Sequence, residues 1–203
     1  ETPVLSNISF SSKPGEVTAI IGGTGSGKST MINLIPRFYD VLEGSVLVNG
    51  IDVREMSQES LREKIGYVPQ KAILFSGTIA ENIRYGKDDA TDDELRYAAD
   101  IAQATEFISQ MKDGFNSEIA QGGTNISGGQ KQRLSIARAL VRKPEIYIFD
   151  DSFSALDFKT DAKLREALKS EVDDATMLIV AQRVATVMDA DQIIVLHEGN
   201  IVG

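Results

Sequence analysis

The segment GGTGSGKS, Gly22 to Ser29, has the residue types and spacing of a loop that binds phosphate. Its glycines let the backbone bend so that successive N–H groups point inward at phosphate oxygens. A β-branched run precedes the segment and a helical pattern follows it, which is the context that such a loop requires. The following helix would add its positive N-terminal end. The pattern predicts ATP or GTP binding, and the alternative is a glycine-rich turn with a chance Gly-Lys-Ser.

The same pattern predicts individual roles. We expect Lys28 to reach the β- and γ-phosphates and Ser29 to hold Mg²⁺. A second acid, Asp150, ends the apolar run IYIFD and would hold Mg²⁺ through water. Alone, Asp150 could equally be a strand-end acid that caps a loop. The predicted nucleotide-binding residues of the loop are Gly22, Gly23, Thr24, Gly25, Ser26, Gly27, Lys28, Ser29 and Thr30.

Short β-branched runs alternate with helical patterns along the chain. Strands are predicted at residues 16–22, 44–50, 65–70, 146–150, 176–181 and 192–196. Helices are predicted at residues 28–38, 91–104, 127–144 and about 160–171. Thr91 and Glu94 have the spacing of a capping box at the start of the second helix. The alternation predicts an open, mainly parallel α/β sheet, and the helical block at about 71–143 indicates an insertion.

Composition narrows the class of protein. The chain has 203 residues, enough for one domain with a substantial core. Its net charge of −9 argues against a nucleic-acid partner, which needs clustered Lys and Arg. The absence of cysteine excludes disulfides and thiolate metal sites. We expect a domain excised from a longer chain, because the sequence starts within an alternating apolar pattern and stops directly after a strand-like run.

The segment ISGGQKQR (126–133), with Gln70 in YVPQ and with SALD (154–157), resembles the nucleotide-binding domain of an ABC transporter. The resemblance covers essentially the whole chain, with the motifs in the family's order and spacing. It implies a P-loop NTPase core with a RecA-like, mainly parallel sheet flanked by helices, and a truncated N-terminal antiparallel β part. It also implies an inserted α-helical subdomain. The expected division of the single domain 1–203 is a core at 1–70 and 144–203 and a helical subdomain at about 71–143.

The resemblance also implies partners. Two such domains pair head to tail, and one domain's Ser-Gly-Gly-Gln run lies over the γ-phosphate that the other binds. Alone, the serine would equally be an ordinary helix cap. Transmembrane helices are expected to contact the Gln70 loop and residues 117–123, which places the domain on the cytoplasmic face of the cell membrane. Gln70 is also expected among the catalytic and Mg²⁺-binding residues. The residues assigned to the partner's nucleotide are Ser127, Gly128, Gly129 and Gln130.

Two segments, AILFSGTIAENIRYG (72–86) and SEIAQGGTNISGGQ (117–130), resemble the exporter branch of the family. In the second segment Glu118 and Gly123 match the loop that contacts transmembrane helices. Ala120, Gln121 and Gly122 depart from it, which loosens the assignment of those contacts. The aromatic residue that the family stacks on adenine is expected just before residue 1.

Two positions depart from the family's hydrolytic pattern. Active members have Glu after the Mg²⁺-holding Asp, where it positions or deprotonates the attacking water; this chain has Asp151. Asp is one methylene shorter, and a misplacement of about 1 Å can cost on the order of 10²-fold in rate. Where the family has a His after the next strand, this chain has Gln182. A glutamine cannot carry a positive charge or shuttle a proton as His can. The one histidine, His197, ends another strand and is interpreted as a structural or surface residue.

Every predicted binding position is kept while both hydrolytic positions change. We therefore expect a degenerate half-site that binds ATP and Mg²⁺ and hydrolyses ATP slowly. The resemblance is to one subunit of a heterodimeric multidrug-type ABC exporter, whose intact Ser-Gly-Gly-Gln run completes the partner's site. The alternative is a homodimeric exporter with slow but competent sites. Another class, a soluble ABC ATPase that acts on DNA or ribosomes, would have a basic surface, inserted coiled coils or zinc-binding cysteines, and the sequence has none of these. A regulatory module that never hydrolyses ATP also stays open.

Overall fold

The computed structural model describes residues 3–203. Their contacts divide them into two compact units, which are described one at a time. The first unit comprises the chain up to Tyr67, Glu145–Asp150 and Asp174–Gly203, and the second comprises Val68–Pro144 and Asp151–Asp173. Residues 151–173 thus group with the helical block, so the exact limits of the inserted subdomain stay a prediction. No helix in the part described has the length and hydropathy of a membrane span.

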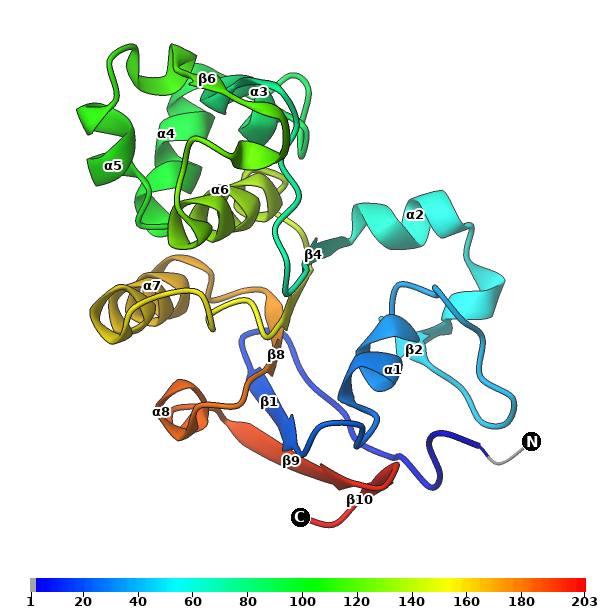
Figure 1. Cartoon of the computed structure of the whole chain (residues 1–203). Helices are drawn as coiled ribbons and strands as arrows, with labels where there is room; N and C mark the ends of the chain where they lie inside the picture. Colours follow the sequence, from blue (N-terminus) through cyan, green and yellow to red (C-terminus); the bar gives the residue numbers. More distant parts are fainter. Residues whose placement is uncertain (1–2) are drawn as a thin grey trace. The chain divides into compact units, whose positions relative to one another are not determined.

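The first unit is built on a six-stranded sheet with the order β10-β9-β1-β8-β7-β4. Strand β1 pairs in parallel with β8 and β9, β7 pairs in parallel with β8, and only the β9–β10 ladder among these is antiparallel. Figure 1 shows β1 lying beside β9. The predicted mainly parallel α/β sheet is therefore confirmed. The strands are β1 (Val17–Gly22), β4 (Ile65–Val68), β7 (Ile146–Asp150), β8 (Thr176–Val180), β9 (Gln192–His197) and β10 (Asn200–Ile201).

Helix α1 (Lys28–Asn33) packs against β1 and β7 and buries Met31 and Ile32 in the core of this sheet. Burial of each such side chain contributes about 1.5–3 kcal/mol. The predicted helix was longer, reaching residue 38. It ends early because Pro36 has no N–H and disfavours helical dihedrals in the residue before it. The unit's other helical segments are η1 (Val53–Glu55), α2 (Gln58–Glu63) and α8 (Val184–Val187).

The strand predicted at 44–50 is present but shorter, as one half of a hairpin. Strand β2 (Leu47–Val48) pairs antiparallel with β3 (Ile51–Asp52). Between them Asn49 has a φ of 52° and Gly50 a φ of 77°, as a type I′ turn requires. Asn-Gly is the strongest short-range hairpin signal, so the sequence did contain the information.

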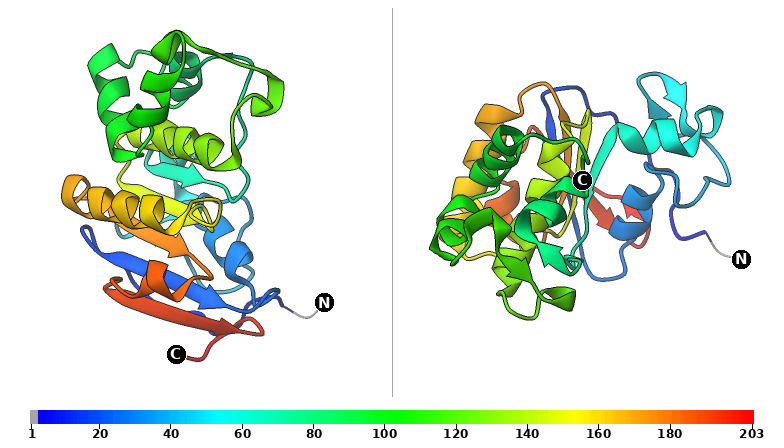
Figure 2. Two further views of the ribbon diagram at one scale, coloured as in Figure 1. Left: turned by 60° about the vertical axis from the view of Figure 1, so that its left-hand side comes forward. Right: turned by 90° about the horizontal axis from the view of Figure 1, so that it is seen from above.

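The second unit is helical, and α6 (Gly128–Val141) contacts both α3 and α4. Figure 2 shows the green helices of this unit packed together in both of its views. Helix α4 begins with the predicted capping box: Glu94 N donates to Thr91 Oγ1, and Thr91 N donates to Glu94 Oε2. The unit's other elements are β5 (Gly77–Thr78), α3 (Ile79–Arg84), α4 (Asp92–Ile101), α5 (Thr105–Gln110), η2 (Gly114–Asn116), β6 (Glu118–Ile119), η3 (Gln121–Gly123) and α7 (Phe158–Glu171).

Candidate nucleotide-binding site

The loop that joins β1 to α1 needs its glycines. Gly25 has a φ of 78° and Gly27 a φ of 103°, in the left-handed region that other residues adopt at a cost. A Cβ on Gly27 would also lie only 2.7 Å from Leu5 Cδ2. The residue pattern read as a phosphate loop therefore corresponds to a backbone that only glycine builds without strain.

Lys28 folds back over its own loop. Its Nζ lies 2.6 Å from the carbonyl oxygen of Gly22 and 2.9 Å from that of Gly23, and donates to both. Ser29, the next residue in the first turn of α1, is exposed. An ammonium held by neutral carbonyls forms stronger bonds to anionic oxygens, so a bound phosphate would compete well for it.

Three adjacent parallel strands end at the same edge as this loop. Ile20 of β1 is paired with Val180 of β8, which is paired in turn with Asp150 of β7. Gln182 follows β8 by two residues, just as Gly22 follows Ile20. Because parallel strands run in the same direction, the phosphate loop, Gln182 and Asp150 all leave the carboxyl edge of the sheet, where open α/β sheets bind ligands.

Asp150 lies half-buried at the end of β7. Burial raises the pKa of its carboxyl group, while a hydrogen bond from Tyr67 and the charge of Lys28 act in the opposite direction. The Tyr67 hydroxyl lies 3.2 Å from Asp150 Oδ2. Burial, followed by the Asp150 charge, raises the pKa of Tyr67 well above its usual range, so the phenol keeps its proton and remains a donor.

The donors available near this edge fit Mg²⁺. Ser29 offers a hydroxyl and Asp150 a carboxylate, and hard oxygen donors of this kind hold Mg²⁺ together with substrate phosphates and water. They come from elements in contact, because α1 packs against β7. The partly desolvated Asp150 carboxylate would gain from a neighbouring cation.

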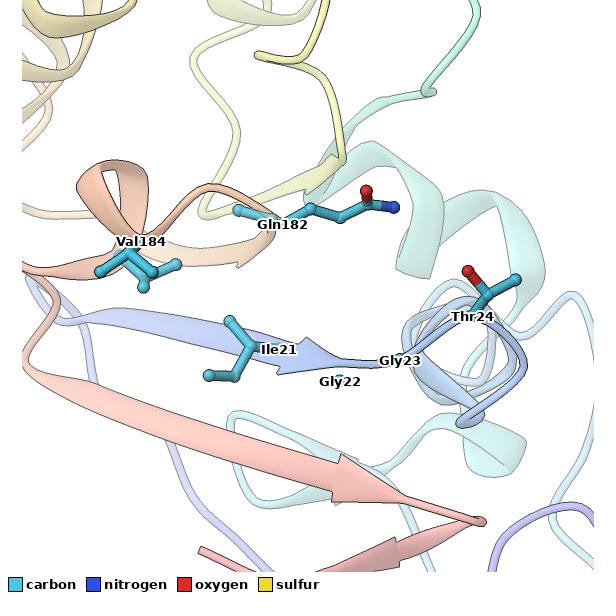
Figure 3. Close-up of a pocket in the computed structure, with 8 residues that line it drawn as sticks. Ile21, Gly22, Gly23, Thr24, Gln182 and Val184 are labelled. Atoms are coloured by element: carbon cyan, nitrogen blue, oxygen red, sulfur yellow. The ribbon is translucent and has the colours of Figure 1, made fainter.

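Gln182 lines a hollow of about 350 Å³ at the carboxyl end of β1. Figure 3 shows its amide extending toward the side of the loop that carries Thr24. The hollow is lined by Ile21, Gly22, Gly23, Thr24, Ala181, Gln182, Val184 and Val187. His197 is exposed at the end of β9 and pairs with Asn200 in the sheet. In the first unit, the predicted position that follows β8 thus presents an amide to the hollow beside the phosphate loop.

The other two candidate hydrolytic residues belong to the second unit. Gln70 Nε2 donates to Asp151 Oδ2 across 3.2 Å. Asp151 follows Asp150 directly in the chain and has a φ of 49°, in the left-handed region. Next to it the buried Ser152 hydroxyl donates to Val68 O across 2.7 Å. The structure therefore joins the predicted pair Gln70 and Asp151 by a direct hydrogen bond.

Ser127 caps α6 in a complete capping box. Its Oγ accepts from Gln130 N at 3.2 Å, and Gln130 Oε1 accepts from Ser127 N at 3.0 Å. Ser127 and Gly128 are nevertheless exposed. A Cβ on Gly128 would meet open space, whereas one on Gly129 would lie 3.2 Å from Ala155 O. The capping role is thus present, and one face of this helix start remains open to solvent.

Arg133 holds the same helix start and was not singled out from the sequence. Its Nε donates to Gly129 O at 3.2 Å and its Nη1 to Gln103 O at 2.9 Å. The guanidinium also lies 4.8 Å from the centre of the Phe107 ring. No local sequence signal marks such a contact, because Gln103 lies 30 residues away.

The segment 117–123 contains strand β6 and the helical turn η3, and the side chain of Asn125 braces it. Asn125 Oδ1 accepts from Ala120 N at 3.0 Å, and Asn125 Nδ2 donates to Glu118 O at 2.9 Å. Glu118, Gln121 and Gly122 are exposed. One position that matches the family pattern, Glu118, is therefore accessible, as are two that depart from it, Gln121 and Gly122, whereas the other matching position, Gly123, is buried.

The fold and the loop together define a P-loop nucleotide-binding domain, and comparison with known proteins gives the family. The ABC transporter family model matches residues 5–154, so the chain belongs to the ABC transporter family. This is a family of ATP-binding domains whose ATPase activity is coupled to transport.

Several relatives resemble the whole chain. An uncharacterized ABC transporter ATP-binding protein of Mycobacterium tuberculosis is 52% identical over 206 residues, covering 100% of this chain. A putative multidrug export ATP-binding/permease protein of Staphylococcus aureus is 46% identical over 202 residues, again covering 100%. The solved structure of a bacterial Atm1-family ABC exporter with ATP bound superposes with a TM-score of 0.95 at 40% identity, covering 98% of this chain. The chain spans about a third (35%) of the length of each of these three proteins.

Proposed function

We propose that this chain is the ATP-binding domain of an ABC exporter and binds ATP with Mg²⁺ at its phosphate loop. The observation that carries the proposal is the shared edge of three parallel strands, from which the loop, Asp150 and Gln182 all emerge. Loop N–H groups and Lys28 bind the phosphates. Ser29 and Asp150 would hold the metal ion, which would neutralise charge on the bound phosphates.

Hydrolysis requires a water aligned with the γ-phosphate. Asp151 accepts a proton from that water as its oxygen attacks the γ-phosphate. Gln70 orients the Asp151 carboxylate through the hydrogen bond between them. Gln182 donates an amide hydrogen bond to the γ-phosphate but has no proton to exchange. The short base and the amide in place of His make ATP turnover at this half-site slow. The complete phosphate loop, with Ser29 and Asp150, lets the same half-site bind ATP well.

The domain pairs head to tail with a second ABC nucleotide-binding domain. The exposed Ser127 and Gly128 of this chain support the assignment, because they leave the start of α6 open for the partner's γ-phosphate. With an intact Ser127–Gln130 run this chain completes the partner's site even if its own is weak. The partner is therefore a different subunit with a competent phosphate loop, in a heterodimeric exporter.

The exporter's membrane part contacts the Gln70 loop and residues 117–123, on the cytoplasmic face of the cell membrane. The names of the S. aureus relative, which joins ATP binding to a permease, and of the Atm1-family exporter support this assembly. A second candidate, a homodimeric exporter with slow but competent sites, is favoured by one observation: Asp151 is already engaged by Gln70.

Steady-state ATP turnover of the protein beside its Asp151→Glu/Gln182→His double variant tests the proposal. We expect ATP binding with little turnover in the parent and a gain of at least about tenfold in the double variant, or about 1.4 kcal/mol of barrier. A matched Lys28→Met version of each protein sets the background. Ordinary turnover in the parent with no gain in the variant would favour the homodimer, and no ATP binding at all would reject the site.

A further inference from the structure

Tyr67 links three elements around the Asp150 carboxylate. It lies on β4, and its hydroxyl is 3.2 Å from Asp150 Oδ2 and 3.3 Å from Asn33 Oδ1. Asn33 is the last residue of α1, the helix that follows the phosphate loop. One phenol thus joins the helix after the loop to the end of β7.

The ring of Tyr67 is fixed by packing. It borders the core of the sheet and meets Phe38 edge to face, with 5.7 Å between ring centres and 67° between planes. Arg62 in turn lies 5.3 Å from the centre of the Phe38 ring. A tyrosine has few rotatable bonds, so a held ring places its hydroxyl within a narrow range.

The hydroxyl has one proton and two neighbours that can accept it. An ionised carboxylate is a stronger acceptor than an amide oxygen, so the proton goes to Asp150. Turning the Asn33 amide by half a turn makes its NH₂ group a donor to the phenol oxygen, and all three groups are then satisfied. The favoured direction of donation runs from Asn33 through Tyr67 to Asp150.

We propose that Tyr67 is a positioning residue for the metal–nucleotide complex: its hydroxyl holds Asp150 Oδ2, so that the carboxylate is kept in one orientation in which it would serve Mg²⁺. This rests on the proposed function, in which Asp150 serves the metal ion. Groups that orient a metal-binding side chain typically change metal affinity by 10–100-fold when removed. For a carboxylate that acts through water, the lower end of that range is expected.

Tyr67→Phe isolates the hydroxyl, because the ring and its contact with Phe38 stay. Binding of a fluorescent ATP analogue is measured in EDTA and across a Mg²⁺ titration, for parent and variant. We expect the affinity in EDTA to stay within about twofold, and the Mg²⁺ concentration at half-effect to rise about tenfold. Equal losses with and without Mg²⁺ would indicate a merely structural role and overturn the proposal.

Two further variants sharpen the test. In an Asp150→Asn background the Tyr67→Phe change should have no further effect on Mg²⁺ dependence, since the two residues act as one unit. Asn33→Asp places a second carboxylate beside the phenol, so it competes for the proton and should shift the Mg²⁺ dependence in the same direction as Tyr67→Phe. Independent effects of Tyr67→Phe and Asp150→Asn would contradict the proposal.

The role of Tyr67 and the proposed function on which it rests can be rejected separately by these measurements. If the parent protein binds the ATP analogue with a clear Mg²⁺ dependence and Tyr67→Phe matches it, only the role of Tyr67 is rejected. If the parent itself shows no Mg²⁺-dependent binding, the proposed function is rejected and the role of Tyr67 with it. Melting temperatures of all five proteins, measured without nucleotide, identify any variant that is damaged in folding.

Discussion

The side-chain amide of Gln70 donates a hydrogen bond to the carboxylate of Asp151, with 3.2 Å between Nε2 and Oδ2. The backbone of Asp151 is in the left-handed region, with a φ of 49°. The bond uses a carboxylate oxygen at position 151, which Asp supplies on a short side chain. The backbone needs a residue that tolerates a positive φ, and Asp and Asn do so better than longer side chains. Asp151 therefore meets two local requirements that a glutamate would meet less well.

A substitution series at position 151 should separate these requirements from catalysis. Asp151→Asn should keep the free energy of unfolding within about 0.5 kcal/mol. Asp151→Glu should lower it by about 1 kcal/mol, because glutamate pays more for the left-handed conformation. Urea denaturation of the variants, with Asp151→Gly as the unstrained reference, measures both. A glutamate variant as stable as the parent would show that the left-handed backbone imposes no constraint here.

Loss of the Lys28 ammonium should weaken nucleotide binding without unfolding the protein. Hydrogen bonds to charged groups are worth about 1.5–3 kcal/mol, so Lys28→Met should raise the Kd for ATP roughly 10- to 100-fold. Lys13→Met changes the same side chain at an exposed position of the first unit and should leave the Kd unchanged. Equal affinities of parent and Lys28→Met, by equilibrium binding, would contradict the role of the loop.

Arg138 should be a large contributor to the stability of the second unit. Its Nη1 donates to Ile73 O at 2.8 Å and its Nε to Asn82 O at 3.0 Å, and the guanidinium lies 5.4 Å from the centre of the Phe75 ring. Burial lowers the pKa of the Arg138 guanidinium, which shows the desolvation that these partners offset.

Arg138→Met leaves those two carbonyls without this donor and should cost about 2–3 kcal/mol in thermal or urea unfolding. Arg138→Lys should cost less, since it keeps the charge but not the planar fork. Arg96→Met, at an exposed ion pair on α4, serves as the control and should fall within about 0.5 kcal/mol of the parent. Similar effects at positions 96 and 138 would refute this account.

Local signals in the sequence predicted most of what local physics determines. The phosphate loop, the strand ending at Asp150 and the box of Thr91 and Glu94 each depend on neighbours within a few residues, and each is present. The bond between Tyr67 and Asp150 joins residues 83 apart, and that between Arg138 and Ile73 residues 65 apart. No pattern in one sequence encodes such pairs, because only the packing of distant elements brings them together.

The charge of Glu94 should matter to stability only above acidic pH. A hydrogen bond from Lys87, and then one from Thr91 N, lower the pKa of Glu94 from its ordinary 4.5 to about 2. A carboxyl whose pKa is depressed on folding adds stability above its unfolded pKa and loses it as the pH falls toward the folded value.

Glu94→Gln keeps the capping box but removes the charge. The variant should melt below the parent at pH 7, and the difference should disappear between about pH 4.5 and 2. Added salt should reduce the difference at pH 7, because the pair with Lys87 is only partly buried and salt screens it. A difference in melting temperature that stays constant across this pH range would mean that the Glu94 charge is not its source.

The neighbouring glycines at the start of α6 should respond in opposite ways, which separates folding from function. Gly129→Ala puts a Cβ 3.2 Å from Ala155 O and should destabilise the protein. Gly128→Ala meets open space and should be neutral or stabilise by up to about 1 kcal/mol, since alanine is the better helix former. If the exposed face of Gly128 receives a partner's phosphate, the same harmless methyl should still depress ATP turnover of the paired domains. Normal turnover in a well-folded Gly128→Ala variant would leave the start of α6 as a helix cap and nothing more.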